Sequence, residues 1–433
     1  MVEPTNYGTV HLDGHLVGAV LYDPETKVTS FEYAPEWLKS GFSISPLKLP
    51  LTDQIFSFPH LPWETYKGLP SALADTLPDD FGNSIIDAWL ARNGRQSHEF
   101  SSLERLMYTG SRGMGALEYK PALIKESGPD NIELDELLNL AQSVLDIRNN
   151  MKADVSDEGL AEILLVGTSA GGARAKAVIG INESRDTILS GQRKLPKGFE
   201  HYLIKFDGVK ERSSRSEVFG DPQGYGRLEY AYYLAAVDAG IDMMPCELLE
   251  ESGRAHFMTK RFDRIDGNKI HYQSLCAMDH ADFKKAGSYS YEQMLSVMRT
   301  LKLPLSDALQ LIRRMIFNVL ARNHDDHTKN FGFIYNDGKW ALSPAFDIAY
   351  SYKPGSPWVE RHQLTINGKR DDFVYNDFEA AVSHSTVLIK QLPEIFDQVK
   401  DAVLNINERM IEAGVSESQR VHVMDTLRLN IAR

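Results

Sequence analysis

A cluster of charged and polar residues lies between two apolar runs late in this 433-residue chain. Residues 323–330 read NHDDHTKN, with Val319-Leu320 before them and Phe331-Gly332-Phe333 after them. A charge held between buried segments is costly unless it is paired or holds a cation, so this segment must form a defined polar site. A further carboxylate, Asp347, closes the nearby segment LSPAFD, residues 342–347.

Asp325, Asn330 and Asp347 have the order and spacing of a phosphoryl-transfer site. In that layout the first Asp accepts the proton of the attacking hydroxyl, while the Asn and the later Asp hold magnesium. Oxygen ligands without cysteine are those that magnesium prefers. A lone D-x-x-x-x-N segment is usually a solvated turn; the apolar flanks and Asp347 favour the catalytic interpretation here. His327 and Lys329, within the same block, are candidates for nucleotide binding.

Composition narrows the class of protein. The hydrophobic fraction of 42% and the charged fraction of 25% are typical of globular proteins. A net charge of −13 argues against broad adhesion to nucleic acid, although it does not exclude a local basic patch. Cys246 and Cys276 are too few for a disulfide framework or a cysteine-rich zinc site. Without a signal peptide or an apolar run of about 18 residues, we expect a cytoplasmic protein.

The first third of the chain combines strands and helices. Residues 9–12 and 16–22 flank Asp13-Gly14, a pair typical of a tight hairpin turn. Residues 30–33 alternate as a further strand, and residues 75–91 repeat apolar side chains at helical spacing. Residues 126–160 are acidic and helix-prone, which indicates a connector.

A lysine within an apolar strand marks the second part of the chain. Lys205 lies in the strand 201–206, and a helix over residues 227–239 follows it and stops at Gly240. Such a lysine can reach outward to solvent, or it can bind nucleotide phosphates with a helical glutamate beside it. Glu229 is the candidate partner, although acidic residues are common near helix starts.

Two more segments are candidates for nucleotide contact. The glycine-rich turn 167–172 lacks the Walker spacing, yet its backbone N–H groups can cover phosphates between strands 163–166 and 177–181. The residues that we assign to this phosphate site are Gly171, Gly172, Ala173, Arg174 and Lys176. Residues 255–264 read as a strand and a polar connector, and residues 258–264 are either a nucleotide-base hinge or an ordinary strand end.

The glycine-rich turn also satisfies G-x-S-x-G around Ser169, so a serine hydrolase is a rival function. That motif requires a helix after the turn, whereas residues 177–181 favour a second strand. A plain structural turn is the third interpretation.

The order of these elements predicts the fold class. From about residue 290 the pattern is helical: Ser306 can cap the helix that leads to Asp325, and residues 374–433 contain two or three amphipathic helices. We therefore expect an α+β, two-lobed protein-kinase-like fold with a β-rich N-terminal lobe and an all-helical C-terminal lobe. The expected parts are an N-terminal α/β subdomain (1–150), a nucleotide-binding β-rich part (151–265) and a helical C-lobe (266–433).

Taken together, these motifs resemble the HipA family of bacterial serine/threonine kinases, the toxin half of HipBA toxin–antitoxin modules. The similarity runs over nearly the whole chain, and its most specific part is D-x-H-x-K-N-F followed by S-P-x-x-D. The other segments that carry the resemblance are residues 33–38, 74–83, 169–176, 204–205 and 261–264.

The resemblance implies an ATP- and Mg2+-dependent protein kinase with Asp325 as catalytic base and Asn330 and Asp347 as magnesium ligands. Lys205 would contact the nucleotide phosphates, and the segment from Lys260 to Phe262 would flank the adenine. Ser169 would match the serine that members of the family autophosphorylate, which ejects the phosphate loop and silences the kinase.

The implied partner is a small helix-turn-helix antitoxin dimer, HipB-like, which binds the toxin and operator DNA together. An aminoacyl-tRNA synthetase is the implied protein substrate, because the best-known member acts on glutamyl-tRNA synthetase. No membrane partner is expected. The alternative is a catalytically weak kinase-like binding module that acts only as a co-repressor with antitoxin and DNA; the three metal-site residues argue against it.

Some positions depart from the family pattern. Position 326 is Asp where the namesake toxin has Gly, which leaves the flexibility and metal number of this loop open. The glycine-rich loop reads Gly-Gly-Ala-Arg rather than Ala-Gly-x-Gln, which leaves Ser169 and Thr168 as alternative phosphorylation sites. Asn323 stands where common eukaryotic kinases have the His of H-R-D.

Overall fold

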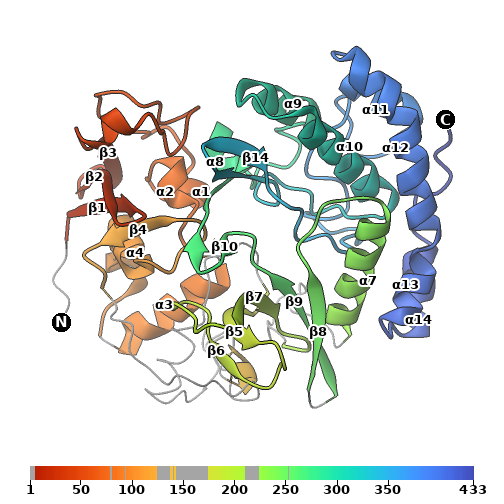
Figure 1. Ribbon diagram of the computed structural model, residues 1–433, viewed down its shortest axis with the longest axis horizontal. Coiled ribbons are helices and arrows are strands. Elements are labelled where there is room, and N and C mark those ends of the chain that lie inside the picture. Colours follow the sequence, from red (N-terminus) through yellow and green to blue (C-terminus); the bar gives the residue numbers. More distant parts are fainter. Residues whose placement is uncertain are drawn as a thin grey trace. The chain divides into compact units, whose positions relative to one another are not determined.

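The chain passes back and forth between two units in this computed structural model (Figure 1). Unit 1 comprises Met1–Gln223 and Leu249–Tyr272, and unit 2 comprises Gly224–Leu248 and Gln273–Arg433. The residues that the structure describes are 5–78, 80–92, 94–123, 137–139, 141–142, 174–209, 224–251 and 253–433.

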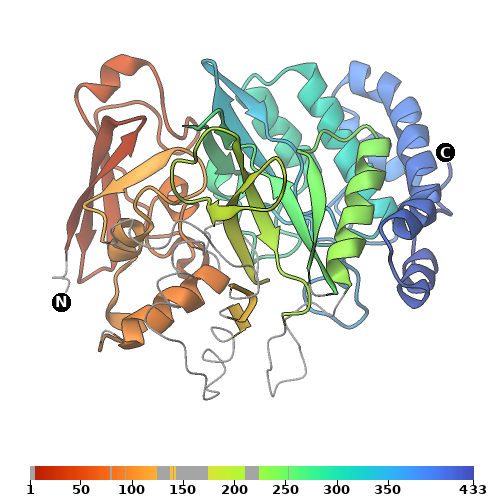
Figure 2. The same cartoon turned by 60° about the horizontal axis from the view of Figure 1, so that its bottom comes forward.

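Unit 1 begins with an antiparallel sheet in the order β3-β2-β1-β4, drawn from red to light orange in Figure 2. Its strands are β1 (Tyr7–Leu12), β2 (His15–Asp23), β3 (Val28–Tyr33) and β4 (Leu117–Lys120). Asp13 and Gly14 both have positive φ, 49° and 78°, as a two-residue hairpin turn requires. The predicted hairpin over residues 9–22 is confirmed.

In the described part of the chain, six helices lie between β3 and β4. They are η1 (Trp37–Ser40), α1 (Trp63–Tyr66), α2 (Ser71–Ala74), α3 (Asp80–Arg92), η2 (Ser97–Glu99) and α4 (Ser102–Thr109). The helix predicted over residues 75–91 begins only at Asp80, so its predicted start was wrong. Pro78 explains the difference, because a proline disfavours the helical conformation of the residue before it.

A second sheet has the strand order β6-β5-β7-β9-β8 and belongs to unit 1 except for the first residues of β8. The strands are β5 (Lys176–Asn182), β6 (Ile188–Ser190), β7 (Phe199–Lys205), β8 (Cys246–Glu251) and β9 (Arg254–Lys260). The predicted strands 177–181 and 201–206 are therefore confirmed. One face of this sheet packs on α3 in a single apolar cluster, which includes Ile179, Tyr202, Ile204, Met258, Phe81, Ile85 and Leu90.

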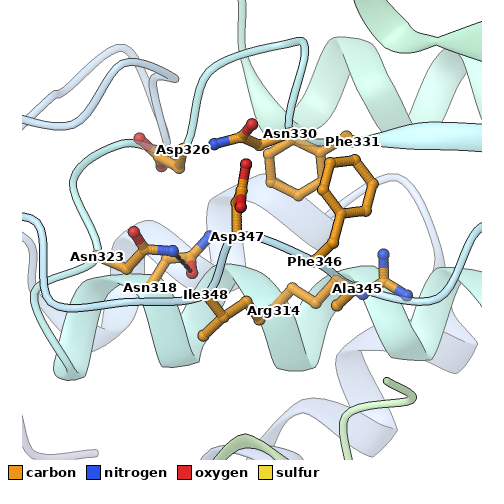
Figure 3. Close-up of a pocket in the computed structure, with 10 residues that line it drawn as sticks. All are labelled: Arg314, Asn318, Asn323, Asp326, Asn330, Phe331, Ala345, Phe346, Asp347 and Ile348. Carbon is orange, nitrogen blue, oxygen red and sulfur yellow. Dashed lines mark hydrogen bonds between the residues drawn. The ribbon is translucent and has the colours of Figure 1, made fainter. Parts of the chain in front are cut away.

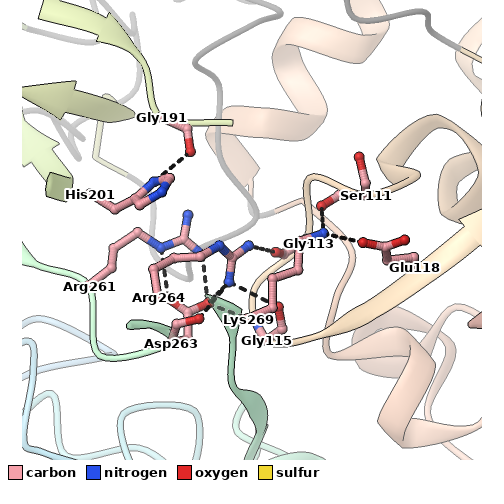
Figure 4. A network of polar contacts seen from close by, with 10 residues as sticks. All are labelled: Ser111, Gly113, Gly115, Glu118, Gly191, His201, Arg261, Asp263, Arg264 and Lys269. Carbon is pink, nitrogen blue, oxygen red and sulfur yellow. Dashed lines mark hydrogen bonds and ion pairs between the residues drawn. The ribbon is translucent and has the colours of Figure 1, made fainter. Parts of the chain in front are cut away.

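A buried ionic network ties the end of this sheet to the N-terminal part of unit 1 (Figure 4). Arg261 and Arg264 both bind the carboxylate of Asp263, with N···O distances of 2.6 and 2.9 Å. The same carboxylate accepts from the backbone N–H of Gly115 at 2.8 Å, and Arg264 donates to the carbonyls of Gly113 and Gly115. Burial raises the pKa of Asp263, but the two guanidinium groups outweigh burial and hold it well below its ordinary value.

A small hairpin follows the network. Its strands are β10 (Arg264–Ile265) and β11 (Asn268–Lys269), and Lys269 donates to the carbonyl of Ser111 and the carboxylate of Glu118, both at 2.6 Å. Segments 111–118 and 261–269, far apart in the chain, are thereby held together.

Helices dominate unit 2. They are α7 (Tyr225–Asp238), α8 (Leu275–Asp279), α9 (Tyr291–Thr300), α10 (Leu305–Leu320), α11 (Tyr375–Val382), α12 (Thr386–Leu404), α13 (Ile406–Glu412) and α14 (Glu417–Met424). In Figure 1, α10 lies beside α12, and α7 packs against α13. The predicted α+β class is confirmed, but the C-terminal part is not all-helical as predicted, because β13 (Gly332–Asn336) and β14 (Lys339–Leu342) form a hairpin in unit 2. The third strand of this sheet, β12 (His271–Ser274), begins in unit 1 and ends in unit 2.

Some helix boundaries in unit 2 differ from the prediction. The predicted helix 227–239 is confirmed as α7, which lies in unit 2 although its residues fall in the predicted nucleotide-binding part. Pro304, not Ser306, precedes α10, because its fixed φ suits a helix start; Ser306 lies in the first turn. The chain after residue 374 forms four helices rather than two or three.

Removal of the Asp263 carboxylate should destabilise the fold strongly. Asp263→Ala leaves two largely buried guanidinium groups without their counter-charge, and we expect a loss of about 3–5 kcal/mol in the free energy of unfolding. Urea denaturation measures it. Glu200→Ala is the matched control, since its ion pair with Lys260 is 45% exposed on the Glu side and should contribute at most about 1 kcal/mol. Equal losses in the two variants would contradict the buried-network interpretation.

Stability should also depend on His271. Burial lowers the pKa of His271 to about 4, and its Nε2–H donates to the carbonyl of Ile44 at 2.8 Å. Since the unfolded chain binds this proton near pH 6.5, stability is complete above that pH and falls as the pH drops from 6.5 toward 4, by up to about 3 kcal/mol. His271→Gln keeps a donor without titrating, so its unfolding free energy should fall less over this range; identical pH profiles would refute the assignment.

Candidate active site

The polar loop after α10 alternates between buried and accessible side chains. His324, Asp326 and Thr328 are 0–2% exposed, whereas the side chain of Asp325 is 46% exposed and that of His327 is 18% exposed. Consecutive side chains of an extended segment point to opposite sides. The loop therefore directs one set of side chains inward as anchors and presents Asp325 and His327 on the other side.

Each inward side chain of this loop has a hydrogen-bond partner in unit 2. Thr328 Oγ1 donates to the carbonyl of Ala281 at 2.6 Å, and His324 Nδ1 donates to the carbonyl of Glu360 at 3.1 Å. Burial lowers the pKa of His324 to about 2, so this ring stays neutral. The loop is thus fixed at points on both sides of Asp325.

The carboxamide of Asn330 folds back onto the start of the loop. Its Nδ2 donates to the backbone carbonyl of Asp325 at 2.8 Å, and its backbone N–H donates to the carbonyl of His327 at 2.9 Å. His327 Nε2 lies 3.8 Å from Asp325 Oδ1. The structure therefore brings Asp325, His327 and Asn330 together.

Asp347 completes this arrangement from the segment after β14. It lines a small pocket together with Asn330, and Figure 3 shows the Asp347 carboxylate directed toward the Asn330 side chain. The φ of Asp347 is 53°, in the left-handed region that non-glycine residues rarely adopt. Such backbone strain concentrates at functional sites. The segment before Asp347 is held by Arg314, which donates to the carbonyl of Ser343 at 2.7 Å.

The donors in this pocket suit a magnesium ion. Asn330 and Asp347 supply hard oxygen ligands, the kind that Mg2+ binds together with water and phosphate. The described residues contain no group of three or more His, Cys, Asp or Glu arranged for a metal. Two buried atoms, Asn323 Oδ1 and His327 Nδ1, have no hydrogen-bond partner within the described residues, which is typical of sites that bind a polar ligand.

Asp326 is not arranged as a further metal ligand. Both of its carboxylate oxygens accept hydrogen bonds from protein donors, at 2.7–2.9 Å. It is a residue whose role the sequence left open, and its partners Tyr291, His362 and Gln363 were not foreseen. The polar Asn318 on the apolar face of α10, which donates to Tyr291, was the one local signal of this network.

Two lysines face each other on the second sheet of unit 1. Lys176 of β5 lies directly opposite Lys205 of β7 in the antiparallel register, and the two residues are only 2% and 8% exposed. They lie on the sheet face opposite the apolar cluster with α3, beside Phe257, whose ring centroid is 5.8 Å from Lys205 Nζ. The register of β5 and β7 thus brings two residues that we predict to bind phosphate to neighbouring positions on one face of the sheet.

Other predicted nucleotide contacts have structural neighbours of their own. Lys260 forms an ion pair with Glu200, and Phe262 packs against Tyr272 with ring centroids 5.3 Å apart. Lys329 Nζ lies 5.2 Å from the ring centroid of Phe283, beside His327. Glu229 is buried in α7, within unit 2, whereas Lys205 belongs to unit 1. The pairing of Lys205 with Glu229 stays a prediction.

The glycine-rich turn lies outside the described residues. This applies to Thr168, Ser169, Gly171, Gly172 and Ala173, whereas Arg174 and Lys176 are described. After Arg174 and Ala175 the chain enters strand β5, not the helix that a nucleophile elbow requires. This strand argues against the hydrolase interpretation of Ser169.

Family models match most of the chain. The HipA N-terminal domain matches residues 8–120, and the HipA-like C-terminal domain matches residues 168–406. The chain belongs to the HipA family. Its kinase-like α+β fold agrees with this membership, and the resemblance drawn from the sequence motifs is confirmed.

Relatives cover nearly the full length. The Sinorhizobium fredii protein named "Putative kinase Y4mE" is 24% identical over 96% of this chain and 95% of its own length. HipA of Shewanella oneidensis MR-1, solved with HipB and its operator DNA, matches with a TM-score of 0.65 and 15% identity over 96% of this chain and 94% of that one. Within the part of the chain that the structure describes, no helix has the length and apolarity needed to cross a bilayer.

Proposed function

We propose that this HipA-family chain is an ATP- and Mg2+-dependent serine/threonine protein kinase, the toxin of a toxin–antitoxin pair. The observation that carries the proposal is the meeting of Asn330 with both Asp325 and Asp347: Asn330 hydrogen-bonds the backbone of Asp325 and lines one pocket with Asp347. Phosphoryl transfer needs a group that accepts the hydroxyl proton and groups that hold magnesium, and these three residues would supply both.

In this reaction a serine or threonine hydroxyl attacks the γ-phosphorus of ATP. The new bond joins the hydroxyl oxygen to phosphorus, the bond to the β-phosphate oxygen breaks, and ADP leaves. Asp325 accepts the hydroxyl proton, a role that its 46% exposed side chain allows. Bound magnesium would neutralise charge on the transferred group, held by Asn330 and Asp347.

Unit 1 would hold the rest of the nucleotide. Lys176 and Lys205 supply two positive charges on one sheet face, which suits phosphate oxygens, and Arg174 and the turn Gly171-Gly172-Ala173 would extend this contact. His327 and Lys329 would contact phosphate from the loop of unit 2. Lys260 and Phe262 would flank the base, and Glu229 would orient Lys205.

The regulatory part of the proposal follows the family. Ser169, or Thr168 beside it, would be autophosphorylated, and a small helix-turn-helix antitoxin dimer would hold the chain on operator DNA. The Shewanella relative, solved with HipB and operator DNA, supports this partner class. An aminoacyl-tRNA synthetase is the proposed class of protein substrate.

Loss of the base should abolish transfer. Asp325→Asn cannot accept the hydroxyl proton, so we expect the rate of phosphoryl transfer from radiolabelled ATP to fall by about 100-fold or more with the fold intact. Phosphopeptide mapping of the wild-type protein should place the label on Ser169 or Thr168. Asp337→Asn, at the exposed tip of hairpin β13–β14, is the matched control and should retain the wild-type rate. Wild-type labelling by Asp325→Asn would exclude the assigned base.

Loss of a metal ligand should weaken nucleotide binding. Saturating Mg2+ and ATP should raise the melting temperature of the wild-type protein by roughly 5 °C, since a ligand that binds only the folded state stabilises it. Asp347→Asn tolerates the left-handed backbone but removes the charge, so most of this shift should disappear. An undiminished shift in Asp347→Asn would contradict the metal site. Absence of any shift in the wild type, with antitoxin binding intact, would favour the co-repressor module.

A further inference from the structure

Asp326 is buried, whereas its neighbours Asp325 and His327 direct their side chains to the other, accessible side of the loop. It is 1% exposed, whereas its neighbour Asp325 is accessible. A buried charge is retained only where donors surround it, so its partners define what it does.

Three donors from two separate segments of unit 2 converge on Asp326. Oδ2 accepts from Tyr291 Oη of α9 at 2.9 Å and from His362 Nδ1 at 2.9 Å, and Oδ1 accepts from the backbone N–H of Gln363 at 2.7 Å. His362 and Gln363 belong to the segment after Asp347, more than thirty residues from the loop. Asp326 thereby ties the loop to this segment and to α9.

A chain of buried hydrogen bonds continues from Asp326 to the C-terminal end of α10. Asn318 Nδ2 donates to Tyr291 Oη at 3.0 Å, and Asn323 Nδ2 donates to Asn318 Oδ1 at 2.9 Å. Asn318, Asn323 and Asp326 all line the pocket that contains Asn330 and Asp347 (Figure 3). Burial and the adjacent carboxylate raise the pKa of Tyr291 far above its ordinary value, so its hydroxyl remains a donor. Three residues of the pocket lining are therefore joined, through Tyr291, in one chain of hydrogen bonds.

We propose that Asp326 is a positioning residue for the phosphoryl-transfer reaction, which holds the loop so that Asp325 keeps its place beside Asn330. This inference rests on the proposed kinase function and deepens it. Asp326 follows Asp325 directly, so rotation of the peptide between them would move the base. A displacement of about 1 Å at a reacting group can reduce a rate by about 100-fold.

The hydrogen bond from the Gln363 N–H to Asp326 also orders segment 358–363. Gln363 donates through its side chain to the carbonyls of Trp358 and Arg361, and its own carbonyl accepts from Gly287 at 2.8 Å. His324, two residues before Asp326, binds the carbonyl of Glu360. Release of Asp326 would therefore loosen segment 358–363 as well as the loop.

The test separates positioning from substrate binding and from simple stability. In Asp326→Ala we expect kcat to fall at least tenfold while the KM for ATP changes less than threefold. Asp326→Asn keeps an acceptor for the Gln363 N–H and should lose less. Hydrogen exchange of the Gln363 amide should accelerate in Asp326→Ala, a readout that does not need kinase activity.

Two tyrosines of the same segment provide a matched pair. Tyr291→Phe removes one donor to Asp326 and should lower kcat several-fold. Tyr289→Phe removes a hydroxyl that donates to Asp279 at 2.6 Å rather than to Asp326, and should leave kcat within twofold of wild type. This pair and Asp326→Asn keep the test decisive if Asp326→Ala fails to fold.

Several outcomes would overturn the proposal. They are a kcat within twofold of wild type in both Asp326→Asn and Tyr291→Phe, an equal loss in Tyr289→Phe and Tyr291→Phe, or unchanged protection of the Gln363 amide in Asp326→Ala. A wild-type protein that transfers no phosphate would instead overturn the kinase function, while the exchange measurement would still decide whether Asp326 ties the segments together.

Discussion

The candidate site depends on the hydrogen bonding of buried polar side chains in one short loop. His324, Asp326 and Thr328 are shielded from water, so each must find a partner within the protein or destabilise the fold. Their partners lie in segments that follow or precede the loop by tens of residues. The hydrogen bonds of these buried neighbours therefore fix the position of the accessible Asp325. The candidate base is thus held in place by buried side chains other than its own.

In unit 1, too, buried contacts position segments that carry candidate site residues. The Asp263 carboxylate and its two arginines join segment 111–118 to the end of β9, and the sheet that carries Lys176 and Lys205 packs on α3 through its other face. Apolar packing fixes one side of that sheet, and the two lysines lie on the other side. In both units, buried contacts fix the segments that carry candidate site residues.

The sequence predicted what local patterns determine. Short-range patterns predicted the turn at Asp13-Gly14 and the strand that carries Lys205. They also predicted the site of Asp325, Asn330 and Asp347, in which Asn330 hydrogen-bonds the backbone of Asp325 and lines a pocket with Asp347. Helix starts were less accurate where a proline intervened, as at Pro78 and Pro304. The partners of Asp326 could not be predicted, because no local pattern links position 326 to Tyr291, His362 or Gln363. The position of Lys176 directly opposite Lys205 could not be predicted either, because it depends on the register of β5 with β7.

That register has an energetic consequence. Two lysines directly opposite each other on neighbouring strands raise the electrostatic cost of pairing β5 with β7, and nearby counter-charges lower that cost. Under the proposed function, a bound triphosphate would be one such counter-charge. Nucleotide binding would then also favour the pairing of these two strands.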